Sequence, residues 1–302
     1  GDSGSPCSHP GIRKSVVTIT ALVDGGGTKT RVRFLNNADQ TVITEVVTGP
    51  SNLGLGAEVC WQQIHDAVDL AGLSMPAKCV VGIAGSEYLR QRAEFLAQAS
   101  CQTVLVSDRD AGLFGAHKGR PGGCLTVGTG VAFAWIDHQG NLAHRGGFGF
   151  VLGDQGGGAW IGWRVLQELV RLSDRNQLDL VHHRLIIALG IGETANHWVQ
   201  FANEAGPRAF ALLARAVVDS EDKVPLAAEI LTEGLQLLWR LIEDFPGSLP
   251  LALVGGLSTL YGPRLAALGY QMVDPEGDAL DGLRFIDQHL DHLIVEHWIS
   301  DA

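Results

Sequence analysis

The sequence has little cysteine, no long apolar run and few positive charges for its 302 residues. Its five cysteines stand singly, without a C-x-x-C pair or the cysteine and histidine spacing of a zinc site, so buried or free thiols in a reducing cytoplasm are expected. No stretch reaches the length of a membrane span, which argues against a membrane partner. The formal charge of −11 at pH 7 argues against a nucleic-acid partner, because binding to a phosphate backbone needs a basic face.

The composition is that of a globular protein, and the chain is long enough for two domains. Hydrophobic residues make up 46% of the chain and charged residues 18%. Residues 1–14 are polar and rich in Gly, Ser and Pro, which predicts a flexible leader without the layout of a signal peptide. A composition break at His117–Gly123 marks a boundary, so we expect an N-terminal domain over residues 15–118 and a C-terminal domain over residues 119–302.

The first strong pattern is a strand, a tight turn and a second strand between Val16 and Leu35. The turn consists of glycines, hydroxyl side chains and one cation: Gly25, Gly26, Gly27, Thr28, Lys29 and Thr30. Glycines can take positive φ and expose backbone N–H groups, which suits a nucleotide phosphate. Asp24 precedes them and would repel phosphate, so it fits as a holder of Mg²⁺ or of its waters. An ordinary glycine-rich hairpin with a solvated aspartate is the alternative.

The same pattern returns in the second half of the chain, at Leu125–Asp137. Its turn consists of Gly128, Thr129 and Gly130. Two such units predict a duplicated architecture with one phosphate hairpin in each domain. A buried strand at Leu251–Val254 leads to a third glycine turn, which contains Gly255, Gly256 and Ser258. That turn suits the close approach of an adenine or ribose, and a plain strand-to-helix turn explains it equally well.

Two polar side chains are candidate ligand contacts because of their positions, one at the end of a predicted strand and one in a turn-rich loop. The strand Thr103–Val106 delivers Asp108 at its carboxyl end, where ligands bind in open α/β sheets. Asp108 also suits the N-cap of a helix over Ala111–Ala116, and both roles can hold together. Asn52 is the one long-reaching polar side chain of the loop Thr48–Gly56.

A glycine-rich segment runs from His144 to Gly158 and holds seven glycines in fifteen residues. Each glycine inside a helix or strand costs about 0.5–1 kcal/mol relative to Ala, so the segment should be a shaped loop whose backbone approaches something closely. Asp154 is its only acidic residue, and Phe148 and Phe150 are its expected apolar anchors. An amphipathic helix is expected to follow, and the stretch between residues 173 and 224 is expected to be mostly helical.

The order of these motifs is more specific than any one of them. In sequence they read VDGGGTKT, GPSNLGLG, VGIAGSE, VSDRDAGLFGAHKG, LTVGTG, GGFGFVLGDQGGGAWIG and LVGGLS. Residues 16–283 thereby resemble the N-acetylglucosamine kinase and bacterial glucosamine kinase family, a BadF/BadG-type ATPase group of the actin/hexokinase/Hsp70 superfamily. The resemblance implies an α/β fold of two ribonuclease-H-like domains, an interdomain cleft that closes on sugar and MgATP, and a cytoplasmic homodimer. The C-terminal helix would pack back on the N-terminal domain.

The resemblance also implies roles for particular residues. Gly25–Thr30 matches the first phosphate loop and Gly128–Gly130 the second, with Asp108 as the catalytic base and Asp24 as the residue that positions Mg²⁺. The adenosine turn matches Gly255, Gly256 and Ser258. The sugar-contacting positions match Asn52, Asp108, Gly146, Gly147, Phe148 and Asp154. The mammalian enzymes carry Trp in place of Phe148 and Ser-Asn in place of Val131 and Ala132, so this chain has fewer polar groups near the substrate.

The resemblance therefore predicts an ATP-dependent kinase for an amino sugar, N-acetylglucosamine (to N-acetylglucosamine 6-phosphate) or glucosamine. Two alternatives share parts of the pattern. An activator-type ATPase of the benzoyl-CoA reductase or dehydratase kind has similar nucleotide motifs but holds a [4Fe–4S] cluster with cysteines that bridge a dimer. A non-catalytic sugar sensor usually adds a DNA-binding helical domain, for which the polar leader is too short.

Overall fold

The computed structural model describes residues 18–291 and 293, which places the predicted leader and Cys7 outside the described residues. The first of two five-stranded sheets has the order β3-β2-β1-β4-β5. Its strands are β1 (Ile19–Gly25), β2 (Thr30–Asn36), β3 (Val42–Thr48), β4 (Lys78–Ile83) and β5 (Gln102–Val106). The second sheet has the order β10-β9-β6-β7-β8. Its strands are β6 (Gly122–Val127), β7 (Val131–Ile136), β8 (Leu142–Gly146), β9 (Pro250–Val254) and β10 (Gln271–Val273).

The two sheets have one topology. In the first, β1 pairs antiparallel with the hairpin strand β2 and parallel with β4, and in the second β6 pairs in the same two ways with β7 and β9. The outer strands β3 and β8 extend the hairpins antiparallel, while β5 and β10 extend the parallel side. The duplicated architecture expected from the two glycine turns is therefore confirmed.

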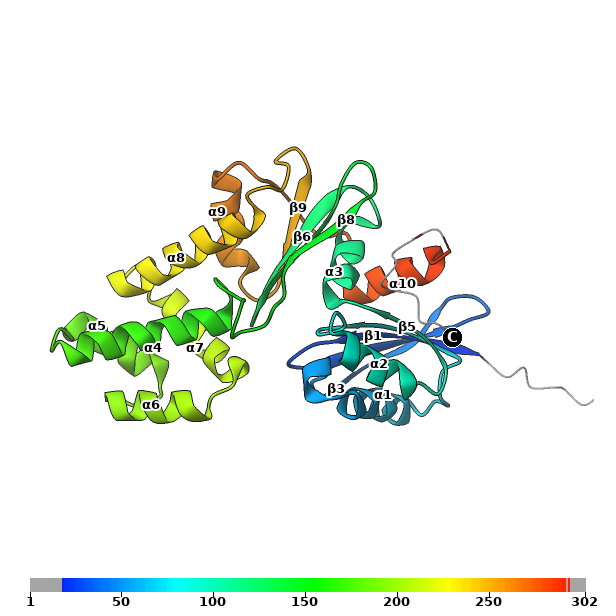
Figure 1. Cartoon of the computed structure of the whole chain (residues 1–302), viewed down its shortest axis with the longest axis horizontal. Coiled ribbons are helices and arrows are strands. Elements are labelled where there is room, and N and C mark those ends of the chain that lie inside the picture. The colour runs from blue at the N-terminus through cyan, green and yellow to red at the C-terminus, as the bar shows by residue number, and fades with distance from the viewer. Residues whose placement is uncertain (1–17, 292, 294–302) are drawn as a thin grey trace, which may run out of the picture.

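A shared helical layer joins the two sheets (Figure 1). It consists of α3 (Asp108–His117) and α10 (Ala279–His289), whose apolar side chains form one buried cluster with residues of both sheets. The cluster includes Leu22 and Val80 from the first sheet and Cys124 and Ala252 from the second. The opposite face of the first sheet is covered by α1 (Ala57–Ala71) and α2 (Leu89–Ala97).

Ion pairs fix the start of α10 to strand β2 of the first sheet. Arg31 Nη2 donates to Asp278 Oδ2 at 2.6 Å, and Arg33 Nη1 donates to Asp281 Oδ1 at 2.7 Å. Both arginines belong to β2, so the last described helix packs on the sheet formed by the start of the chain. The division into domains at residues 118 and 119 stays a prediction.

Gly282 determines how closely α10 crosses α3. A Cβ there would clash with the Ala111 carbonyl oxygen and would lie 2.5 Å from the Gly115 nitrogen. Because both obstacles are backbone atoms, the helices would have to separate, and we expect Gly282→Ala to lower the free energy of unfolding by about 1–3 kcal/mol. Gly112→Ala on α3 is the matched control, since its Cβ would meet only Cys124 Sγ at 3.8 Å. Urea unfolding compares the two, and equal stability would contradict the close crossing.

The second half of the chain carries a helical extension beside its sheet (Figure 1). Its helices are α4 (Gly158–Asp174), α5 (Leu180–Leu189), α6 (Ala195–Glu204), α7 (Pro207–Asp219) and α8 (Pro225–Ile242), and α9 (Ser258–Ala267) follows β9. The expected helical stretch between residues 173 and 224 is confirmed by α5, α6 and α7. Pro225 opens α8 at the first helical position, where its missing N–H costs nothing. Trp163 on α4 is 39% exposed.

Candidate active site

The first glycine turn closes the β1–β2 hairpin at the carboxyl end of β1. Gly25 pairs with Thr30, and the Thr30 hydroxyl lies 2.7 Å from Gly49 O and from Ser51 Oγ. A Cβ on Gly25 would stand 2.6 Å from Ser51 Oγ, so this glycine permits a close approach. None of the three glycines has a positive φ, so this turn does not use the left-handed conformation that is open to glycine.

The tip of this turn is open to solvent. Gly27, Thr28 and Lys29 are exposed, and a Cβ on Gly27 would meet nothing within 4 Å. The Gly26 N–H donates to Lys29 O at 3.1 Å, which keeps the turn tight. The exposed tip therefore presents hydroxyl, amide and ammonium donors that an anion can reach.

Asp24 stands beside this turn and is held by an arginine from the next strand. Arg31 Nε donates to Asp24 Oδ2 at 3.4 Å, a long hydrogen bond, while its Nη2 is bound to Asp278. Burial raises the pKa of Asp24, and Arg31 opposes that rise. Among the described residues the other carboxylate oxygen of Asp24 has no hydrogen-bond partner, and Asp24 lies directly beside the exposed turn.

Asp108 is the first residue of α3 and lies at the carboxyl end of β5. The helix is capped by Ser107, whose Oγ accepts a hydrogen bond from the Asp110 nitrogen at 3.0 Å, so the expected N-cap role of Asp108 is wrong. Its Oδ1 accepts from the Arg109 nitrogen at 3.0 Å. Burial raises the pKa of Asp108 to about 6, the charges of Glu87 and Asp24 add to the rise, and Arg109 opposes it. A carboxylate with such a pKa is suited to accept a proton near neutral pH.

Arg109 ties this site to the second half of the chain. Its Nη1 donates to Gly146 O at 3.0 Å, its Nη2 forms an ion pair with Glu87, and its side chain is 9% exposed. Its Nε is buried without a hydrogen-bond partner in the part of the chain that the structure describes. The sequence did not single out Arg109 or Glu87, because their contacts join residues far apart in the chain. The one sign in the sequence that could have pointed to Arg109 is its position directly after Asp108, the candidate base.

The second glycine turn is covered by the glycine-rich segment. Asp154, with a left-handed φ of +62°, accepts a hydrogen bond from the Val131 nitrogen at 2.9 Å, and a Cβ on Gly130 would lie 2.5 Å from the Asp154 carboxylate. The start of α4 binds the same turn, since the Gly158 nitrogen donates to Gly128 O at 2.8 Å. The glycine-rich segment was expected to approach something closely, and much of that approach is to the second glycine turn of the same chain.

The third glycine turn adjoins the second. Gly255 has a φ of +103°, and a Cβ on it would lie 2.5 Å from Val127 O and 3.0 Å from the Gly128 nitrogen. The Leu257 nitrogen donates to Val127 O at 3.1 Å. Because β6 and β9 are parallel neighbours, their carboxyl ends bring these two turns together. Gly255 and Gly256 are exposed at this edge.

The remaining predicted residues lie in the connecting loops. Asn52 Oδ1 caps a short 3-10 helix, Leu53–Leu55, by accepting from the Leu55 nitrogen at 3.2 Å. Gly146 and Gly147 have positive φ, and Gly147 packs against the Arg109 guanidinium. Phe148 is 66% exposed, so its expected role as an apolar anchor is wrong.

Phe150 does anchor the segment. Its ring lies 5.4 Å from that of Phe210 and 6.4 Å from that of Trp163, measured between ring centroids. The anchoring contact thus joins the glycine-rich segment to helices α4 and α7. Phe148, in contrast, leaves its ring available to a ligand.

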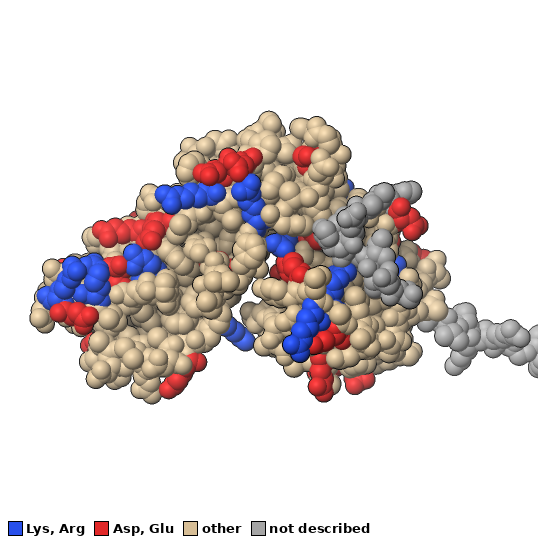
Figure 2. All heavy atoms as spheres, viewed as in Figure 1, with Lys and Arg blue, Asp and Glu red and all other residues tan. Residues whose placement is uncertain are grey.

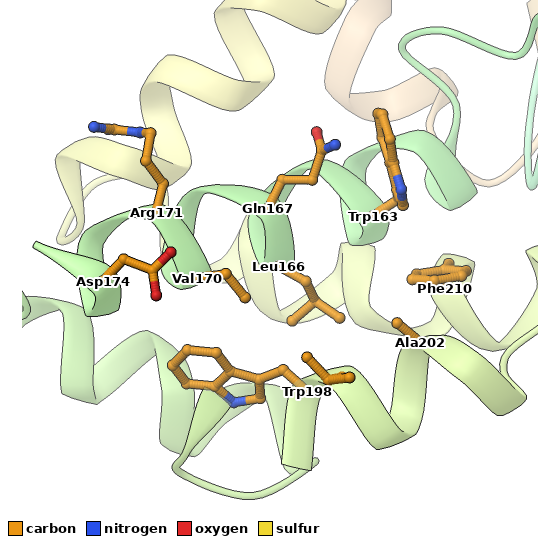
Figure 3. Close-up of a pocket in the computed structure, with 10 residues that line it drawn as sticks. Trp163, Leu166, Gln167, Val170, Arg171, Asp174, Trp198, Ala202 and Phe210 are labelled. Carbon is orange, nitrogen blue, oxygen red and sulfur yellow. The ribbon is translucent and has the colours of Figure 1, made fainter. Parts of the chain in front are cut away.

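The space-filling view shows a notch between the two halves of the molecule (Figure 2). A separate hollow of about 400 Å³ lies between α4 and α6, with Trp163 and Phe210 at one end and Arg171 and Asp174 at the other (Figure 3). No predicted site residue lines it.

The donor set at the first turn fits a magnesium ion that arrives with a nucleotide. Among the described residues, no group of three His, Cys, Asp or Glu side chains could hold a metal. Mg²⁺ usually keeps several waters and is bound through one or two carboxylates and substrate phosphates. The single carboxylate of Asp24 beside an exposed, donor-rich turn agrees with that pattern.

Comparison with known proteins places these features in a family. Residues 23–236 match the BadF/BadG/BcrA/BcrD ATPase family. The glucosamine kinase GspK of Vibrio cholerae is 33% identical over 162 residues, which are 50% of this chain and 54% of that protein. An N-acetylmuramic acid/N-acetylglucosamine kinase of Clostridium acetobutylicum is 25% identical over 165 residues, 51% of this chain and 54% of its own. The chain thus spans about half the length of the curated relatives it matches.

A solved structure resembles nearly the whole described fold. A candidate N-acetylglucosamine kinase of Chromobacterium violaceum superposes with a TM-score of 0.80 at 29% identity, covering 89% of this chain and 99% of its own. A second candidate N-acetylglucosamine kinase, from Porphyromonas gingivalis, superposes with a TM-score of 0.66 at 13% identity, covering 90% and 99%, and shares the fold. The predicted fold class, two related α/β domains of the actin-like ATPase type, is confirmed. No helix in the described part of the chain is long and apolar enough to cross a membrane.

Proposed function

The chain belongs to the BadF/BadG/BcrA/BcrD ATPase family, and from that premise we propose that it is an ATP-dependent kinase for glucosamine or N-acetylglucosamine, with the C6 hydroxyl as acceptor. The observation that carries the proposal is Asp108. It lies at the carboxyl end of a parallel strand, its pKa is raised to about 6, and Arg109 beside it reaches the second half of the chain at Gly146. One matching relative is named for glucosamine and another for N-acetylmuramic acid and N-acetylglucosamine, which supports an amino sugar as the acceptor.

Asp108 is the proposed general base. The acceptor hydroxyl would attack the γ-phosphorus in line with the leaving oxygen, while Asp108 takes the hydroxyl proton. Phosphoryl transfer needs little covalent help from a protein, so most of the acceleration would come from positioning and charge neutralisation.

The three glycine turns are the proposed binding elements for ATP. The first turn, Gly25–Lys29, whose residues Gly27–Lys29 are exposed, would hold phosphate oxygens from the first half, and the turn Gly128–Gly130, whose Thr129 is exposed, would hold them from the second. The turn with Gly255, Gly256 and Ser258 would hold the adenosine. Asp24 would hold Mg²⁺ or its waters, and the ion, when bound, neutralises phosphate charge.

The proposed sugar contacts come from both halves of the chain. Asn52 would offer its side-chain NH₂, since its oxygen already caps the 3-10 helix. Asp154 would use the carboxylate oxygen that does not accept from Val131. Phe148 would offer its exposed ring to one face of the sugar, and Gly146 and Gly147 would allow close approach of the backbone. A homodimer and a cytoplasmic location belong to the same proposal.

A coupled ADP-release assay with MgATP tests this function. It is run on glucosamine, N-acetylglucosamine, glucose and no sugar, with product mass identifying a sugar phosphate. Release that depends strongly on one amino sugar is the expected result and would also identify the preferred 2-substituent. Sugar-independent release would favour the activator-type ATPase, and no release with any sugar would overturn the proposal.

The pH profile should report the raised pKa of Asp108. A general base must be deprotonated, so kcat/KM should fall as the pH drops below about 6, rather than below the ordinary value of 3.8. Glu87→Gln should move this acid limb to lower pH, because the charge of Glu87 helps to raise the pKa. Glu94→Gln, which removes an exposed partner of Arg90, is the control and should leave the limb in place. An acid limb near 4 in the unaltered protein would contradict the role of Asp108.

A further inference from the structure

Two cysteines face each other at the start of the parallel strands, at the opposite end from the candidate active site. Cys79 lies in β4 and is fully buried, and Cys101 immediately precedes β5 and is half-buried. Their sulfur atoms are 3.4 Å apart. A disulfide bond is about 2.05 Å long, so the sulfurs have only a short distance to close.

The surroundings of the pair favour one reactive sulfur and one resolving sulfur. The hydrogen bond between the two thiols lowers the pKa of Cys101, and the same contact, with burial, raises the pKa of Cys79. The Thr103 hydroxyl also lies 3.8 Å from Cys101 Sγ. A thiolate with access to solvent is the nucleophilic form of cysteine, so Cys101 is the one that reacts first.

The other described cysteines lack these features. Cys60 and Cys124 are buried, and burial raises the pKa of Cys60 to about 11 and that of Cys124 to about 12. Neither is within hydrogen-bond distance of another sulfur in the described residues. The sequence showed only scattered cysteines, because the pairing of Cys79 with Cys101 depends on the neighbouring strands.

We propose that Cys79 and Cys101 form a peroxide-sensitive dithiol that closes reversibly to an intramolecular disulfide. The Cys101 thiolate attacks one oxygen of hydrogen peroxide, the O–O bond breaks, and the leaving hydroxide takes a proton to become water. The resulting sulfenic acid is attacked by Cys79, the S–O bond breaks, and the thiol proton leaves with the hydroxide as a second water. Two thiols and one peroxide thus give one disulfide and two waters, and an added dithiol reverses the reaction.

The position of the pair predicts what the disulfide would change. It would link the segment between α2 and β5 to β4, closing a loop between residues 22 positions apart in the chain. A cross-link restricts the unfolded chain, so the melting temperature should rise by a few °C. Asp108 lies at the other end of β5, and the first glycine turn lies beside the other end of β4, so turnover should stay within about twofold of the reduced protein.

The experiment compares the full chain before and after stoichiometric hydrogen peroxide. Intact mass should fall by about 2 Da, and a non-reducing peptide map should contain a Cys79–Cys101 cross-linked peptide. Dithiothreitol should restore the mass. Cys60→Ala is the control and should oxidise in the same way as the unaltered protein.

Two variants separate the roles of the sulfurs. Cys101→Ser, at the more exposed site, should remove the mass loss and leave the Cys79 thiol unreacted. Cys79→Ala should instead accumulate a sulfenic acid on Cys101, trapped by dimedone. No mass loss in the unaltered protein, a cross-link that uses another cysteine, or an unchanged cross-link yield in Cys101→Ser would overturn the proposal.

Discussion

Asp108→Asn is expected to lower kcat by about 10²–10⁴-fold while the protein remains folded. Asparagine keeps the size of the side chain and the acceptor for the Arg109 N–H, but it cannot take the proton of an acceptor hydroxyl. Substrate binding should change far less than turnover, since the variant loses an interaction needed mainly in the transition state. Initial rates of sugar-dependent ADP release, with KM for both substrates, measure the effect.

The same substitution should stabilise the fold above neutral pH. The pKa of Asp108 is raised from 3.8 to about 6, so the carboxyl group favours the folded state only while it is protonated. That contribution is complete below pH 3.8 and is lost as the pH rises through about 6. Melting temperatures at pH 5 and pH 8 should therefore show a larger gain for Asp108→Asn at pH 8.

Asp219→Asn is a matched control for both effects. It removes a carboxylate that is 55% exposed at the end of α7 and pairs with Arg215, an exposed ion pair worth little to stability. It should change neither kcat nor melting temperature noticeably. If Asp108→Asn lost turnover together with melting temperature, its low activity would reflect damage to the fold and the assignment of the base would fail.

The fold was predictable from the sequence because its signals are local. The two strand, glycine turn and strand patterns correspond to the β1–β2 and β6–β7 hairpins, and the apolar runs before Asp108 and Gly255 correspond to β5 and β9. The order of the strands in each sheet then determines which strands pair with one another. The docking of α10 on α3 depends instead on contacts such as Gly282 against Ala111, which join distant parts of the chain.

The candidate site was predictable only in part, for the same reason. Asp24 and Asp108 are marked by their positions at the carboxyl ends of strands, whereas Arg109 gains its importance from Glu87 and Gly146, which sequence spacing does not reveal. For the glycine-rich segment, the composition correctly predicted a close approach of the backbone but did not reveal what it approaches. The Asp154 side chain contacts the second glycine turn of the same chain.

Gly255→Ala should lower kcat/KM for ATP by about 10–100-fold, mainly through a higher KM. The new Cβ would lie 2.5 Å from Val127 O and 3.0 Å from the Gly128 nitrogen, and a φ of +103° is strained for alanine. Both neighbours are backbone atoms where β6 leads into the second glycine turn, so relief of the clash must separate the two turns that would hold one nucleotide. A displacement of about 1 Å at such a site can cost 10²-fold.

Gly262→Ala on α9 provides the matched control, because apart from its own chain neighbours its Cβ would meet only Leu253 Cδ2 at 3.9 Å. Gly262 precedes Pro263, so the added methyl group should lower stability, but it should leave the KM for ATP unchanged. Titration with a fluorescent ATP analogue separates binding from turnover in both variants. If Gly255→Ala bound the nucleotide as tightly as Gly262→Ala, the turn would be a plain strand-to-helix connection, and adenosine would have to bind elsewhere along the carboxyl ends of β6 and β9.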